Sequence, residues 1–174
     1  MSEPIPGRDL IQYGRFSANW NTVWTHDGTG AAVTVSDPTY GAFLMTNGLA
    51  EVTQDISLPD FTEAQMPRVT PRVAFQYENY NEGPGAGVLI TTSKGVEFSI
   101  DLSGKTTKAN WNPYPFNAIK GVTAADTSLG ATVKAPDISG SSGLRITDIK
   151  VDLLLVPLKL NAIQLDEKVY EQSA

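Results

Sequence analysis

Alternation of apolar and polar residues is the dominant pattern in the middle of the chain. In the segment VEFSIDL, residues 96–102, four apolar side chains fall on one side of an extended backbone, and Glu97, Ser99 and Asp101 fall on the other. This period of two predicts a half-buried antiparallel strand. The same kind of run recurs in AAVTV (31–35), AFLMT (42–46), EVTQDISL (51–58), RVAFQYE (72–78) and GVLITT (87–92).

Turn-forming residues separate these runs. The linker Ser93-Lys94-Gly95 between 87–92 and 96–102 predicts a hairpin. Glycine, proline, asparagine and serine are also concentrated in SDPTYG, NEGPGAG, NWNPYPFN and PDISGSSG, which we assign to linkers. The sequence shows no βαβ rhythm and no capped helical period before residue 158. About eight strands at this spacing predict an all-β fold, an antiparallel β-sandwich of the jelly-roll kind.

The last apolar run, LRITDIKVDLLLVP (144–157), is longer and changes phase. Ile146 and Ile149 cannot share one face of a regular strand, because they are an odd number of residues apart. A β-bulge near Thr147 and Asp148 reconciles the two halves.

The pattern divides the chain into one domain and two arms. We expect an N-terminal arm at 1–7, a jelly-roll β-sandwich at 8–157 and a C-terminal arm at 158–174. The C-terminal arm is too apolar for an inert tail, so we expect it to cover the sandwich or to contact a neighbouring subunit. The residues predicted to make that contact are Leu160, Ile163, Leu165, Val169 and Tyr170.

Composition narrows the chemistry. The net charge is −6 and no run of basic residues occurs, so nucleic acid and membrane surfaces are not expected partners. The chain has no cysteine and a single histidine, His26, which excludes disulfides, thiolate metal sites and multi-histidine metal sites within one chain. The N-terminus lacks the features of a secretory signal, and we expect synthesis in the cytoplasm.

Four segments resemble a known family when they are taken in order. DLIQYGRFSANW, VTQDISLPDF, RVAFQYENY and LRITDIKVDLL are similar to motifs of the carbohydrate-binding-module-like jelly rolls of the galactose-binding-like class. The chain departs from that pattern at Tyr13, where asparagine is frequent, at Arg15, where an acid is usual, and at Thr147. The resemblance implies a jelly roll, which serves in this family as a sugar-binding module or as a structural domain of phage particles.

Aromatic residues are the candidates for a ligand surface. Trp24, Tyr80, Trp111 and Tyr114 could stack against sugar rings, or against a protein partner, if they are exposed. The alternative is that Trp24 and Trp111 plug the sheet edges and that Trp20 packs under the sandwich.

The resemblance also implies a metal site. Asp148 falls where the family often holds a structural calcium, and Asp9 is the best second ligand. Calcium prefers several oxygen ligands. The alternative is an aspartate that is solvated or caps the bulge, and no cofactor is otherwise expected.

Catalytic motifs are weak. His26 lies beside Asp27, but no G-x-S-x-G motif accompanies them. Acidic pairs such as Glu78/Glu82 or Asp166/Glu167 become glycosidase candidates only if they flank a cleft. We therefore expect a protein that is not an enzyme.

Three functional hypotheses follow from these observations. We predict a virion structural protein, either a capsid decoration or a tail or fibre module of a phage-like particle, that associates with other virion subunits as a homo-oligomer. The alternative is a carbohydrate-binding module that recognises glycans through loop aromatics, and the third is a glycan-degrading enzyme.

Overall fold

The computed structural model describes residues 9–47, 50–79, 85–105, 110–135 and 143–155. The predicted arms at 1–7 and 158–174 and their contact residues therefore lie outside the described residues, as does Tyr80. Within the described part of the chain, no helix is long and apolar enough to cross a membrane.

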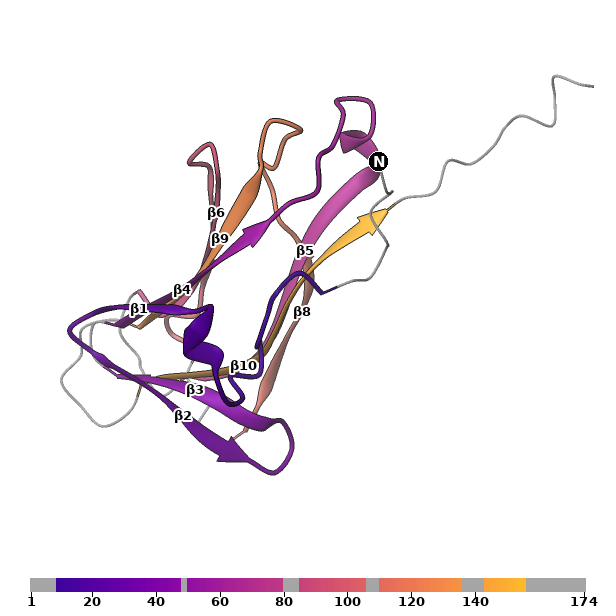
Figure 1. The fold of residues 1–174 in the computed structure, drawn as a ribbon. Helices are drawn as coiled ribbons and strands as arrows, with labels where there is room; N and C mark the ends of the chain where they lie inside the picture. The colour runs from indigo at the N-terminus through magenta and orange to yellow at the C-terminus, as the bar shows by residue number, and fades with distance from the viewer. Residues whose placement is uncertain (1–8, 48–49, 80–84, 106–109, 136–142, 156–174) are drawn as a thin grey trace, which may run out of the picture.

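Two antiparallel five-stranded sheets form a sandwich (Figure 1). Sheet I contains, in spatial order, β1 (Thr25–Gly28), β4 (Ala50–Ser57), β9 (Ser128–Ala135), β6 (Gly87–Thr92) and β7 (Glu97–Asp101). Sheet II contains β2 (Ala31–Asp37), β3 (Gly41–Asn47), β10 (Leu144–Leu155), β5 (Val69–Asn79) and β8 (Asn112–Ala118). The predicted all-β jelly-roll sandwich is confirmed.

The core forms where the apolar faces of the two sheets meet. Side chains alternate between the faces of a strand, so every second residue points inward. On β4 the burial follows this rule, since Val52 and Ile56 are buried while Asp55 and Ser57 are exposed. The largest fully buried side chains come from both sheets and the N-terminal loop, and they include Phe16, Leu44, Val73, Phe75, Ile90, Leu129, Ile146 and Ile149.

The predicted bulge in β10 is confirmed. Its register against β5 shifts between Thr147 and Lys150, and Asp148 adopts a left-handed backbone with a φ of 52°. The N-terminal loop docks at this bulge, where the N–H of Ile149 donates to the carbonyl of Gly14 at 3.0 Å. A Cβ on Gly14 would lie 2.1 Å from the carbonyl oxygen of Ile149, so only glycine allows this approach.

One linker assignment was wrong. The segment NWNPYPFN contains most of β8, which pairs with β5 at the edge of sheet II. Proline is tolerated there because an edge strand needs no donor on its outer side. Two further strands, β1 and β9, were not singled out in the sequence. The 3-10 turns η1 (Trp20–Thr22) and η2 (Met66–Arg68) complete the described elements.

Candidate functional site

The outer face of sheet I is built from polar side chains. On β4 the outward positions are Thr53 and Asp55, and the strand register places them opposite Thr132 and Gly130 of β9. The hydroxyl groups of Thr53 and Thr132 are 2.9 Å apart and form a hydrogen bond across the two strands. Polar residues on the solvent side of a sheet are ordinary. On this face, however, they surround two hollows.

The first hollow, which we call the β4–β9 hollow, has a volume of about 310 Å³. Its floor is Gly130, which has no side chain to fill the space between Asp55 and Thr91. A Cβ added to Gly130 would lie 3.7 Å from Oδ1 of Asp55 and 3.9 Å from the carbonyl oxygen of Thr91. These are ordinary contact distances, so packing does not require glycine at this position. The absence of a side chain instead opens the floor of the hollow.

Polar groups in the β4–β9 hollow are available to a ligand. In the described part of the chain, the side chains of Asp55, Thr91 and Ser128 have neither a hydrogen-bond nor an ion-pair partner. A carboxylate accepts hydrogen bonds, and a hydroxyl group both donates and accepts them. The hollow can therefore bind a small ligand that carries several hydroxyl groups.

Asp126 holds the rim of this hollow in place. Its buried carboxylate accepts hydrogen bonds from the backbone N–H groups of Lys94 at 3.1 Å and Thr123 at 2.9 Å. It also accepts bonds from the hydroxyls of Thr123 and Ser93, and Ser93 lines the hollow. Burial opposes ionisation, but these hydrogen bonds outweigh it and lower the pKa of Asp126 to about 2. The carboxylate therefore fixes the β6–β7 turn as one wall of the hollow.

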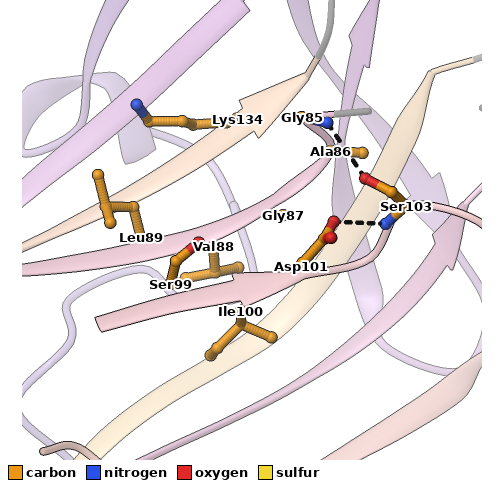
Figure 2. Close-up of a pocket in the computed structure, with 10 residues that line it drawn as sticks. All are labelled: Gly85, Ala86, Gly87, Val88, Leu89, Ser99, Ile100, Asp101, Ser103 and Lys134. Carbon is orange, nitrogen blue, oxygen red and sulfur yellow. Dashed lines mark hydrogen bonds between the residues drawn. The ribbon is translucent and has the colours of Figure 1, made fainter. Parts of the chain in front are cut away.

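The second hollow, the β6–β7 hollow, lies farther along the same face and has a volume of about 270 Å³ (Figure 2). Figure 2 shows the side chains of Leu89 and Ile100 pointing to opposite sides of their strands. Asp101 accepts a hydrogen bond from the N–H of Ser103 at 2.8 Å, and Lys134 of β9 borders the hollow. Both hollows are lined by residues of β6 and β9, although no single residue lines both of them.

The structure separates the predicted aromatic residues. Trp24 is 2% exposed, and its indole Nε1 donates to the carbonyl of Gln12 at 2.9 Å, so it belongs to the core. Trp20 is half-buried and packs against Phe16, in agreement with the alternative interpretation.

The two remaining described aromatics have different partners. Trp111 donates to Oδ2 of Asp37 at 3.3 Å and packs edge-on against Tyr40. Tyr114 stacks on the buried ring of Phe75 with centroids 4.7 Å apart, and burial raises the pKa of its hydroxyl. The structure does not bring Trp24, Trp111 and Tyr114 onto one stacking surface.

The proposed calcium ligands are occupied by other groups. Asp148 accepts hydrogen bonds from Nε of Arg15 and from Nζ of Lys150, both at 2.8 Å. Burial raises the pKa of Asp9, whose Oδ1 accepts the backbone N–H groups of Ile11 at 3.0 Å and Val151 at 3.2 Å. The described residues contain no group of three or more acidic or histidine side chains suited to a metal. This environment does not fit a calcium site, which needs six to eight oxygen ligands.

The candidate catalytic residues that the structure describes do not gather in a cleft. His26 is exposed on β1 opposite Val52. Glu78 forms an ion pair with Arg145, whose Nη1 lies 3.2 Å from its carboxylate. The other predicted acids, Glu82, Asp166 and Glu167, lie outside the described residues.

Sequence reasoning missed the polar face itself. Its residues, such as Thr53, Asp55 and Gly130, are of types common on the solvent side of any strand. The signal was the density of Thr, Ser and Asp in EVTQDISL combined with the glycine at the third position of SLGATVKA. That signal becomes meaningful only when the register pairs these two strands.

Comparisons with known proteins agree on the fold. No protein-family profile matches the chain, and no curated protein sequence matches it. Among solved structures, the carbohydrate-binding module TmCBM61 in complex with β-1,4-galactotriose is similar, with a TM-score of 0.58 and 16% identity. That likeness covers 83% of this chain and 98% of the module.

Two further structures extend the comparison. The tandem CBM22 domains of Paenibacillus barcinonensis Xyn10C give a TM-score of 0.54 at 11% identity, over 87% of this chain and 48% of that one. The enzymatically active domain of tailspike protein 4 from bacteriophage CBA120 also gives 0.54, at 16% identity, over 84% of this chain and only 21% of the tailspike chain. At these identities the likeness shows the fold alone: the chain has the jelly roll of carbohydrate-binding modules.

Proposed function

We propose that this protein is a non-catalytic carbohydrate-binding module that holds an oligosaccharide on the outer face of sheet I. The observation that carries the proposal is the pair of hollows on this face, together with the side chains of Asp55, Thr91 and Ser128, which have no hydrogen-bond or ion-pair partner in the part of the chain described. Sugars offer hydroxyl groups that both donate and accept, and such groups match this lining.

The arrangement of the hollows favours a chain over a single sugar. The β4–β9 hollow lies at the Ser128 end of β9, and the β6–β7 hollow begins at Lys134 near its other end. Strands rise about 3.3 Å per residue, so this span is roughly 20 Å along β9. A ligand of several linked sugar units can contact both hollows at once.

The solved structures support the same class of ligand. TmCBM61 was solved with a bound β-1,4-galactotriose, and nearly its whole length corresponds to this chain. The predicted contact through loop aromatics is not part of the proposal. Trp24 is buried, and the contact through Trp111 and Tyr114, which are half-buried, stays a prediction.

A glycan panel and one filled hollow test the proposal. Binding is measured by affinity gel electrophoresis against neutral polysaccharides, and then by titration calorimetry with oligosaccharides of the best one. Gly130→Val places a branched side chain on the floor of the β4–β9 hollow, where a Cβ fits without a clash. We expect this variant to fold and to lose at least tenfold in affinity.

The matched control is Thr70→Val on the outer side of β5 in sheet II, which should bind like the wild type. The proposal would be contradicted if no glycan in the panel bound, or if Gly130→Val bound with unchanged affinity.

The virion interpretation stays a prediction. It depended in part on the segments 1–7 and 158–174, which lie outside the described residues. A fold shared with one tailspike domain does not distinguish a structural from a sugar-binding role. Deleting 158–174 should abolish assembly if the chain is a virion component, and should leave sugar affinity intact if it acts only as a binding module.

A further inference from the structure

A third hollow lies away from sheet I, between the N-terminal loop and the β2–β3 hairpin. It has a volume of about 460 Å³, and we call it the Arg15 hollow after the charged residue in its wall. Figure 1 shows the N-terminal loop, in indigo, across from the purple β2–β3 hairpin. None of the residues that line it lines the β4–β9 or the β6–β7 hollow.

Arg15 presents a positive charge with a fixed orientation. Its Nε donates to Oδ1 of Asp148 at 2.8 Å, while its side chain is 59% exposed. This bond uses only one of the three guanidinium nitrogens, and the two terminal nitrogens have no partner in the described part of the chain. A guanidinium anchored in this way offers a planar pair of donors that matches a carboxylate.

The nearby acids do not compete for those donors. The second carboxylate oxygen of Asp148 accepts a hydrogen bond from Nζ of Lys150 at 2.8 Å. Asp9 uses its carboxylate to accept two backbone N–H groups. Among the described residues that line the Arg15 hollow, none is acidic. The sheet I hollows, in contrast, include Asp55 and Asp101.

The rest of the wall combines hydroxyl groups with apolar surface. The hydroxyls of Ser17 and Ser36 have no hydrogen-bond partner among the described residues. Tyr40 is held edge-on against Trp111 with ring centroids 5.5 Å apart, and Ala18 and Ala42 add apolar surface. A ligand that fits this wall has an anionic group, several hydroxyl groups and a C–H face.

We propose that the Arg15 hollow is a second binding site, specific for a carboxylate-bearing sugar such as a uronic acid. The carboxylate pairs with the free terminal nitrogens of Arg15, and the sugar hydroxyls bond to Ser17 and Ser36. This site goes beyond the neutral-glycan face of sheet I, and either site can exist without the other.

Two ligands that differ only at one carbon test the charge requirement. Methyl β-glucuronide carries a carboxylate where methyl β-glucoside carries a hydroxymethyl group. We expect the glucuronide alone to shift the amide signals of Ser17, Ser36 and Gly41, and to bind more weakly as salt rises. Equal binding of the two ligands, binding of neither, or shifts confined to sheet I would overturn the proposal.

Variants at the charged wall sharpen the test. Arg15→Gln should weaken glucuronide binding by about tenfold or more, because it removes a charge-assisted pair. The matched control is Lys150→Gln, which removes the other bond to Asp148 but does not line the hollow, and should change the affinity less than twofold. Unchanged affinity in Arg15→Gln would contradict the proposal.

A second pair of variants covers the case in which Arg15→Gln fails to fold. Thr34 and Val33 are neighbouring exposed residues of β2 whose side chains point to opposite faces of the strand, and only Thr34 lines the hollow. Thr34→Glu should weaken glucuronide binding at least threefold more than Val33→Glu does. Equal effects of the two substitutions would mean that the carboxylate does not bind there.

Discussion

The outer faces of the two sheets use their polar side chains in opposite ways. On sheet II, Arg72 and Asp152 form a bidentate ion pair with distances of 2.9 and 2.6 Å, and the Asp152 side chain is only 8% exposed. The same guanidinium lies 4.6 Å from the ring centroid of Phe116. On sheet I, the ion pair of Lys134 and Glu51 is 37% and 43% exposed.

This difference indicates which face binds a ligand. Polar groups that satisfy one another stabilise the fold and have little left to offer a partner, whereas groups that face a hollow without a partner are available. Loss of polar contacts on sheet II should therefore lower stability, and loss of polar groups on sheet I should lower affinity.

The largest effect is expected from Arg72 on sheet II. Arg72→Met keeps most of the apolar stem but leaves the carboxylate of Asp152 buried without its cation. We expect a loss of about 3 kcal/mol in the free energy of unfolding, measured by urea denaturation. Glycan affinity should not change. A loss below 1 kcal/mol would show that the two faces do not differ in this way.

Asp126 should have the next largest effect, and the effect should depend on pH. Its pKa falls from 3.8 to about 2 on folding, which corresponds to about 2 kcal/mol of stability. Because the folded-state pKa is the lower one, this stability is present above pH 4 and is lost as the pH falls towards 2.

Asp126→Asn should therefore lower the free energy of unfolding by about 2 kcal/mol at pH 7 and by roughly half as much at pH 3. Urea denaturation at the two pH values checks this. An equal loss of unfolding free energy at the two pH values would show that the ionised carboxylate does not anchor the rim.

Asp55 tests the sheet I face without a change in side-chain size. Asp55→Asn replaces a charged acceptor with a neutral one, and we expect about fivefold weaker glycan binding in calorimetry. Stability should change little, because Asp55 is exposed. Asp60→Asn is the matched control, since it removes the same charge outside both sheet I hollows. Equal effects of the two substitutions would mean that net charge is responsible.

The smallest effect is expected at the exposed ion pair of sheet I. Glu51→Gln breaks the 3.2 Å contact with Lys134. Solvent screens this pair, so the free energy of unfolding should change by at most about 0.5 kcal/mol in the urea assay. A loss of unfolding free energy close to that of Arg72→Met would show that the ion pairs on the two sheet faces do not differ in their contribution to stability.

Much of the fold could be predicted from local patterns. The alternation in VEFSIDL predicted β7, and the change of phase in 144–157 predicted the bulge at Asp148. The strand β8 was missed because Pro113 and Pro115 are typical of turns, and their tolerance depends on the edge position of the strand. That position is set by the topology.

The candidate site could not be predicted, for a related reason. The β4–β9 hollow exists because Gly130 lies opposite Asp55, and this pairing joins residues 75 positions apart through the register of two strands. Trp24 is likewise buried against Phe16, and its indole donates to the carbonyl of Gln12, contacts that no local pattern reveals. Trp24 was therefore assigned to binding, although it lies in the core. The assignment of Trp111 and Tyr114 stays a prediction.

Amide chemical-shift mapping tests the central claim most directly. The labelled full chain is titrated with the oligosaccharide that binds best in the glycan panel. We predict that the largest shifts fall on Thr53, Gly130 and Thr132, with little change on the outer face of sheet II. Largest shifts at Trp111, Tyr114 or Arg72 would contradict the assignment of glycan binding to sheet I.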